Sequence, residues 1–300
     1  HDASVVTDGT VSERSLQIAV ISDAQFTAAG GSLNEAIIAN LRRSLRQIVA
    51  AGPDLVVIDG DLVDEANAAT FALAEQILDE ELTSKADIPW IWAPGNHEVM
   101  GNPISLFAQQ EGAQLYSTQV LKRTRVTTLD SSRGTLHADG TDQLAKLRAQ
   151  LDADADDPSV TGEVIVFHMP TEDYLPDKNS QLSDRTEAQA MDDMLAAWRQ
   201  RTGKSVAVVN GHVGGFNARS FDGVTQLTNG NSGKGPAATA DNGGFTGWTM
   251  LGVNPGAGIT GDTLGDATAR TRWLRAETHA HVDADADPTG GNGVVVNASA

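Results

Sequence analysis

The chain has 300 residues, of which 40% are hydrophobic, enough to form one large α/β domain or two small ones. Its 21 Lys and Arg residues against 40 Asp and Glu residues give a formal charge of −19, which disfavours binding to long nucleic acids and anionic membrane surfaces. The absence of cysteine excludes disulfides, thiolate metal sites and cysteine nucleophiles.

The first part of the chain alternates short apolar runs with segments of helical periodicity. The apolar runs at 17–22, 55–59 and 89–93 are rich in Ile, Val and Trp and have the length of buried strands. Helices are predicted at 41–51 and 66–82, where apolar residues recur at helical spacing, and Gly52-Pro53 ends the first of them. This alternation of strand and helix predicts βαβ units.

The second part continues the pattern and then changes character. Strands are predicted at 125–129, 163–167 and 205–209, with helices at 141–151 and 189–201. The last predicted strands, at 224–227, 247–253 and 273–281, alternate more and are expected to be antiparallel. The acidic stretches 153–157 and 283–288 are interpreted as solvated loops, and residues after about 282 are expected to be partly disordered.

Polar residues with metal-ligand side chains follow five of the predicted strands. Because ligands bind beyond the carboxyl ends of the strands in an open α/β sheet, these side chains are expected to converge. Carboxylate, amide and imidazole groups together suit Mn, Fe or Zn. The residues are Asp23, Asp61, Asn96, His97, His168 and His212.

Each of these residues also has a purely structural interpretation. Asp23 is a possible helix N-cap and Asp61 a turn carboxylate, while Asn96 and His97 follow a Pro-Gly turn. A lone histidine after an apolar strand, such as His168, is more often packed in the core than a ligand. A shared site is favoured because it explains all five strand ends at once. The structural interpretation needs a separate reason for a metal-ligand side chain at each of them.

The strand-end motifs resemble those of the calcineurin-like metallophosphoesterases. The family pattern is D-x-H, G-D-x-x-D, G-N-H-D/E, a lone His and G-H-x-H, each at a strand end. The corresponding segments here are DAQ at 23–25, GDLVD at 60–64, GNHE at 95–98, His168 and GHVG at 211–214. The resemblance runs from about residue 17 to about residue 253, and it implies an α/β fold, an αββα sandwich of mixed central sheets with flanking helices.

The resemblance also implies a domain organisation. A metallophosphoesterase domain is expected at 1–275, followed at 276–300 by a terminal strand and a flexible tail, or the edge of a further domain. The segments DAQF, NGNSGK and GFTGW are similar to phosphoesterase modules attached to phosphodiester glycosidase domains in secreted actinobacterial proteins. The protein is therefore expected to be secreted or associated with the cell wall. Its signal is expected to be absent from this chain, and other domains are possible in a longer chain.

Two departures from the family pattern fall on the same metal. The histidine of D-x-H is Gln25 here, and the second histidine of G-H-x-H is Gly214. The resemblance then implies one tight site, formed by Asp61, Asn96, His168 and His212. It also implies a weak oxygen-rich site with Asp23, bridging Asp61 and the Gln25 carbonyl, to which Asn217 is a possible additional ligand. We therefore expect fewer than two tightly bound metal ions per chain.

By the same resemblance, the chain is predicted to hydrolyse phosphate esters, in particular phosphodiesters, through metal-activated hydroxide. His97 follows the ligand Asn96 and is expected to assist the leaving group, with Glu98 or a similar carboxylate orienting its imidazole. The alternative is a metal-retaining module that binds a phosphorylated glycan, or has only a structural role, with weakened catalysis.

The expected partner is a phosphorylated small molecule or glycan, without long nucleic acid and without membrane insertion. No substrate-binding residue is predicted with one exception left open. The segment NGNSGK at 229–234 is either a plain turn or a loop whose N–H groups and lysine hold a phosphate oxygen.

Overall fold

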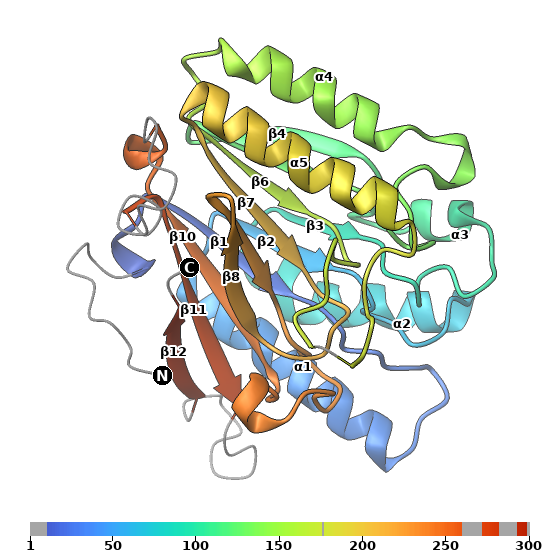
Figure 1. Ribbon diagram of the computed structural model, residues 1–300. Helices are drawn as coiled ribbons and strands as arrows, with labels where there is room; N and C mark the ends of the chain where they lie inside the picture. Colours follow the sequence, from blue (N-terminus) through green and yellow to red (C-terminus); the bar gives the residue numbers. More distant parts are fainter. Residues whose placement is uncertain (1–10, 176, 260–271, 282–292, 299–300) are drawn as a thin grey trace.

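Two six-stranded sheets stacked face to face form the centre of the fold, and helices cover both outer faces (Figure 1). The computed structural model describes residues 11–175, 177–259, 272–281 and 293–298. Three apolar clusters of buried residues mark the contacts between these layers, one between the sheets and one beneath each helical layer. The predicted αββα sandwich is therefore confirmed.

The first sheet has the strand order β12-β11-β10-β1-β2-β3. Its three strands from the first part of the chain are parallel, whereas β10, β11 and β12 add to it in antiparallel pairing. Its strands are β1 (Leu16–Ile21), β2 (Leu55–Asp59), β3 (Trp90–Ala93), β10 (Gly247–Val253), β11 (Leu274–His281) and β12 (Gly293–Ala298).

The second sheet has the strand order β4-β5-β6-β7-β9-β8. Its four central strands are parallel, and the two edge strands are antiparallel to their neighbours. Its strands are β4 (Ser117–Leu121), β5 (Thr124–Thr128), β6 (Gly162–Val166), β7 (Ser205–Asn210), β8 (Asn217–Phe221) and β9 (Val224–Thr228).

Each helical layer packs on one sheet. α1 (Ser32–Ala51) and α2 (Ala68–Leu78) cover the first sheet, and α4 (Gln143–Ala155) and α5 (Arg185–Thr202) cover the second (Figure 1). A short helix, α3 (Ile104–Ala108), follows β3 and adds the buried Phe107 to the first layer. Within the described residues, no helix combines the length and the apolar character needed to cross a bilayer.

Several predicted boundaries are corrected by the structure. α1 begins at Ser32, nine residues before its predicted start at 41, because its first turns extend past the core and leave Leu33 76% exposed, without a continuous apolar face. α1 does end at Gly52, as predicted, where the backbone takes a left-handed conformation with φ 64°. The helix predicted at 66–82 comprises α2 and a π-helical turn, Asp79–Thr83.

Two edge strands and one acidic segment were not predicted correctly. β4 and β8 expose much of both faces, so their sequences lack the apolar pattern that marks a buried strand. The segment 153–157, interpreted as a solvated loop, contains the last turn of α4, and its Asp154 is buried. Asp154 forms an ion pair with Arg125 of β5, which neutralises the carboxylate inside the protein.

The segment 276–300 lies partly within the first sheet. Residues 276–281 belong to β11, as the predicted strand at 273–281 implied, and β12 pairs with β11 in antiparallel register. The part of the predicted flexible tail at 293–298 is therefore a strand. The acidic stretch 283–288 and residues 282–292 and 299–300 lie outside the described residues. That this segment borders a further domain stays a prediction.

A half-buried carboxyl group on α5 makes stability depend on pH. Burial raises the pKa of Asp192 from 3.8 to about 6. Between these values the folded chain retains the proton and the unfolded chain has released it, so rising pH lowers the free energy of unfolding. We expect Asp192→Asn to remove this loss. The free energy of unfolding of the variant, relative to that of wild type, should therefore rise by about 2 kcal/mol between pH 4 and pH 7.

Urea denaturation of both proteins across this pH range measures the difference. The matched control is Asp193→Asn, because Asp193 is the next residue on the same helix and is exposed. If the free energies of unfolding of Asp192→Asn and wild type differed by the same amount at all pH values, the prediction would be contradicted.

Candidate metal centre

The predicted site residues come together at the carboxyl ends of the strands, where the chain turns sharply. Asp23 follows β1, Asp61 follows β2 and His212 follows β7, and all have left-handed backbone conformations, with φ of 52°, 52° and 67°. Residues other than glycine seldom adopt this conformation, and it is concentrated at functional sites. The turns direct these side chains toward one another at the carboxyl ends of the strands.

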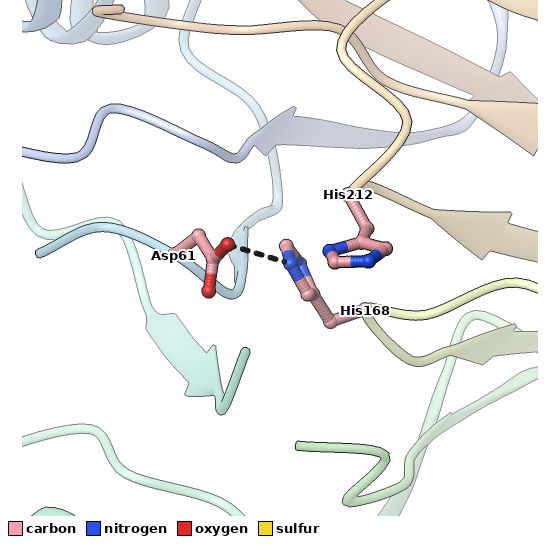
Figure 2. A group of neighbouring side chains, drawn as sticks. All are labelled: Asp61, His168 and His212. Atoms are coloured by element: carbon pink, nitrogen blue, oxygen red, sulfur yellow. Dashed lines mark ion pairs between the residues drawn. The ribbon is translucent and has the colours of Figure 1, made fainter. Parts of the chain in front are cut away.

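The centre of the site is formed by Asp61, His168 and His212, each of which offers a ligand atom within 4.8 Å of the others. His168 Nε2 lies 3.1 Å from Asp61 Oδ2, and the rings of His168 and His212 meet edge to face with centroids 5.1 Å apart (Figure 2). His168 Nδ1 donates a hydrogen bond of 2.7 Å to the carbonyl oxygen of Asp59. This bond fixes the ring so that Nε2 faces the site.

Asn96 supplies an oxygen that its own surroundings do not satisfy. Asn96 Oδ1 is buried and accepts no hydrogen bond from the described part of the chain. A buried polar atom without a partner is costly unless something else binds it. The two chain neighbours of Asn96 both contact Asp61. An amide oxygen, the Asp61 carboxylate and the imidazoles of His168 and His212 make a mixed nitrogen and oxygen donor set of the kind that fits a divalent transition metal ion.

A close approach of two strand ends holds Asp61 in place. Gly95 lies against Asp61, and a Cβ on this residue would sit 2.2 Å from Asp61 Oδ1. Any side chain at position 95 would therefore displace the carboxylate. The glycine before Asn96 is therefore required by packing around Asp61.

The other side of the site contains Asp23 and Gln25. Asp23 Oδ1 lies 3.8 Å from His168 Nε2, and Asp23 Oδ2 accepts a hydrogen bond of 3.0 Å from the backbone N–H of His212. Gln25 Nε2 donates a 3.0 Å hydrogen bond to Asp61 Oδ2, the same oxygen that faces His168. Asn217 begins β8, where it pairs with Thr228.

His97 borders the site without belonging to the ligand cluster. Its backbone N–H donates a 2.9 Å hydrogen bond to Asp61 Oδ1, and its Nε2 lies 3.9 Å from Asp61 Oδ2. Its Nδ1 donates to the carbonyl oxygen of Asp64 over 2.8 Å and lies 3.3 Å from the Asp64 carboxylate. The imidazole is thus held at one nitrogen and presents the other to the site.

The residue that orients His97 is Asp64, so of the two predicted alternatives Glu98 is wrong and another carboxylate residue is correct. The buried Glu98 carboxylate accepts hydrogen bonds from the backbone N–H groups of Asp61 and Gly95, both 2.7 Å long, and of Leu62, 2.8 Å long. It therefore joins the turns after β2 and β3. Asp64 is the last residue of the G-D-x-x-D motif, so the motif itself was the signal that pointed to it.

The buried charges of the site shift one another's titration. Burial raises the pKa of Asp23 to about 6. Burial alone would also raise the pKa of Asp61, but the attraction of His168 outweighs it and lowers that pKa below its usual range. Burial and the nearby His168 lower the pKa of His212 to about 4, so its imidazole is neutral at pH 7 and able to bind a metal ion.

The fold and the site together define a class of protein: a four-layer α/β sandwich with a carboxylate, amide and imidazole centre at the strand ends. The sequence matches the calcineurin-like phosphoesterase family over residues 16–222, more than half of the chain. The chain therefore belongs to this family, which confirms the resemblance found in the motifs. No match to the chain was found among curated protein sequences.

Solved structures with the same fold come from distant relatives. A dimetal phosphatase from Danio rerio is 14% identical with a TM-score of 0.62, and the alignment covers 95% of this chain and 99% of that one. GAP50 of Plasmodium, described as the anchor in the inner membrane complex, is 10% identical with a TM-score of 0.62, at 95% and 88% coverage. A purple acid phosphatase from yellow lupin is 12% identical with a TM-score of 0.56, at 94% and 52% coverage.

Proposed function

We propose that this chain hydrolyses phosphate esters, and phosphodiesters in particular, with a divalent Mn, Fe or Zn ion held by Asp61, Asn96, His168 and His212. The observation that carries the proposal is the convergence of Asp61, His168 and His212, together with the buried Asn96 Oδ1, which has no hydrogen-bond partner among the described residues. These side chains come from four separate strand ends, so their meeting is a property of the fold as a whole.

The chemistry divides between the cation and the side chains. A bound divalent cation supplies Lewis acidity, which lowers the pKa of water and neutralises phosphoryl charge. His97 presents Nε2 to the site, and in its doubly protonated form it donates the Nε2 proton to the leaving alkoxide oxygen and keeps the Nδ1 proton on the carbonyl oxygen of Asp64. Asp64 holds the imidazole through Nδ1, and the backbone N–H of His97 keeps Asp61 in its ligating orientation.

A hydrolase is favoured over a module that only binds, because His97 is held toward the site although it is not one of the ligands. A purely structural metal centre has no need for an imidazole in this position. The alternative, a module that binds a phosphorylated glycan with weakened catalysis, is favoured by Gln25 and Gly214, which replace two histidines of the family pattern. GAP50, which is described as an anchor, has the same fold, so the fold alone does not decide between a hydrolase and a binding module.

Hydrolysis assays on two small aryl substrates test the function. The purified chain, supplied with Mn²⁺, Fe²⁺ or Zn²⁺ in turn, is incubated with bis(p-nitrophenyl) phosphate and with p-nitrophenyl phosphate. We expect release of p-nitrophenol, faster from the diester, and its loss after treatment with a chelator. Binding of phosphorylated glycans without turnover of either substrate, under all three metals, would favour the alternative.

The substrate class follows from the charge of the chain as well as from the site. With a formal charge of −19, the surface repels long polyanions but not a small ester that carries one or two charges. We propose a phosphorylated small molecule or a phosphate-linked glycan, acted on outside the cell or at the cell wall.

A further inference from the structure

Lys234 extends to the side of the site that holds Asp23 and Gln25. Its ammonium group donates a hydrogen bond to Gln25 Oε1, and Gln25 Nε2 donates one of 3.0 Å to Asp61 Oδ2. An ammonium group can only donate, so the Gln25 atom that meets it must be the oxygen. This fixes the orientation of the amide, and its N–H group is the part that faces Asp61.

The segment that carries Lys234 is held rigidly beside the end of β1. The backbone N–H of Ser232 donates to the carbonyl oxygen of Ser22 over 2.8 Å, and the N–H of Ser22 donates to Ser232 Oγ over 3.2 Å. Asn229 is also buried, and its N–H donates to the carbonyl oxygen of Asn210 over 2.8 Å. The NGNSGK segment is therefore a loop fixed by hydrogen bonds, and it places one cationic side chain, that of Lys234, at the site.

The backbone also excludes the second histidine of the family pattern. Gly214 has φ +84°, and a Cβ on it would lie 2.6 Å from Ala237 Cβ. A side chain at this position is thus both strained and blocked. Two features therefore oppose a metal ion beside Asp23: no imidazole fits at 214, and Gln25 turns an N–H donor toward Asp61.

We propose that the Lys234 ammonium group takes the place of the first metal ion, so that the chain binds phosphate with one divalent cation and one lysine. The proposal rests on the phosphoesterase function proposed above and names the group that contacts the phosphoryl oxygens of the substrate. Lys234 is an exposed residue whose ammonium reaches inward to Gln25, so its donors are open to an anion entering the site. An ammonium supplies a positive charge and three donors, but it does not acidify water as a metal does.

Metal content provides the first test and needs no turnover. After dialysis against metal-free buffer, wild type loaded with Mn²⁺ is expected to retain one equivalent, with the electron paramagnetic resonance spectrum of an isolated ion. The double variant Gln25→His, Lys234→Ala restores an imidazole and removes the competing charge, so it is expected to take up a second equivalent and show coupling between ions. Two equivalents in wild type, or one in the double variant, would overturn the proposal.

Phosphate affinity provides the second test. Titration calorimetry of the Mn²⁺-loaded protein with inorganic phosphate is expected to show binding about 10–100-fold weaker for Lys234→Met, the worth of a charge-assisted hydrogen bond. Lys234→Arg, which keeps the charge, should recover most of the affinity. The matched control is Lys85→Met, which removes the same charge from an exposed position next to the π-helical turn.

Equal phosphate affinities for Lys234→Met and wild type would contradict the role of Lys234, as would equal losses in Lys234→Met and Lys85→Met. Neither measurement depends on hydrolysis. A chain that binds phosphate through Lys234 without cleaving esters would therefore refute the proposed catalytic function and support this inference.

Discussion

His168→Ala and His212→Ala are each expected to abolish metal retention and, with it, hydrolysis. His168 and the neutral His212 supply the two nitrogen ligands of the centre, whereas Asp61 and Asn96 offer only oxygens, so each variant retains a single imidazole. Loss of one imidazole should weaken Mn²⁺ or Zn²⁺ binding by more than about 100-fold, beyond the effect of removing a supporting residue. Elemental analysis after dialysis measures the loss.

Because His168 is fully buried, its replacement also has a cost in stability. His212 is only half-buried, so His212→Ala separates the loss of metal from a loss of fold. The control is His279→Ala, which removes a half-buried histidine whose ring stacks on Trp248 and which belongs to no metal-ligand cluster of the described residues, and it should leave metal content unchanged. Retention of a full equivalent of metal by both folded variants would eliminate the proposed ligand set.

His97→Ala is expected to lower turnover by about 10²–10⁴-fold, the usual contribution of a positioned general acid, while metal content stays the same. Its imidazole contacts Asp64 and faces the site at 3.9 Å from Asp61 Oδ2, but the metal-ligand cluster does not require it. The loss should be greatest for substrates whose leaving alkoxide is most basic, because such leaving groups depend most on protonation. Rates on alkyl and aryl diesters measure this difference.

The comparison of metal content separates the two classes of histidine. A His97→Ala protein that loses its metal would place His97 among the ligands instead of at the leaving group. A variant with full metal content and wild-type rates on both diesters and monoesters would remove His97 from the mechanism.

The sequence by itself determined the elements that are buried on both faces. β2 and β10 match their predicted bounds at 55–59 and 247–253, and every residue of both strands is buried. β2 is a nearly continuous apolar run, which is typical of a strand enclosed between layers. The sequence also indicated which residues follow those strands, and a parallel sheet places such residues at one edge. For this reason the sequence alone predicts that Asp61, His168 and His212 meet.

Strands and helical turns at the margin of the core could not be predicted from the sequence. The half-exposed edge strands β4 and β8 and the first turns of α1 contact water on too many sides to show a periodic apolar pattern. The role of Glu98 was misassigned for a related reason. Its neighbour in the sequence is His97, but its hydrogen bonds go to backbone N–H groups of a different strand end.

Only the tertiary structure decided how the departures from the family pattern are resolved. Gln25 and Lys234 are 209 positions apart, and nothing in their local sequences indicates that they form a hydrogen bond. Local sequence sets the conformation of a strand or a turn, whereas the contacts of a long side chain depend on which distant backbone segments the two sheets bring together. The sequence therefore indicated the types of ligand, whereas the packing of a distant loop decided that the Lys234 ammonium group contacts Gln25.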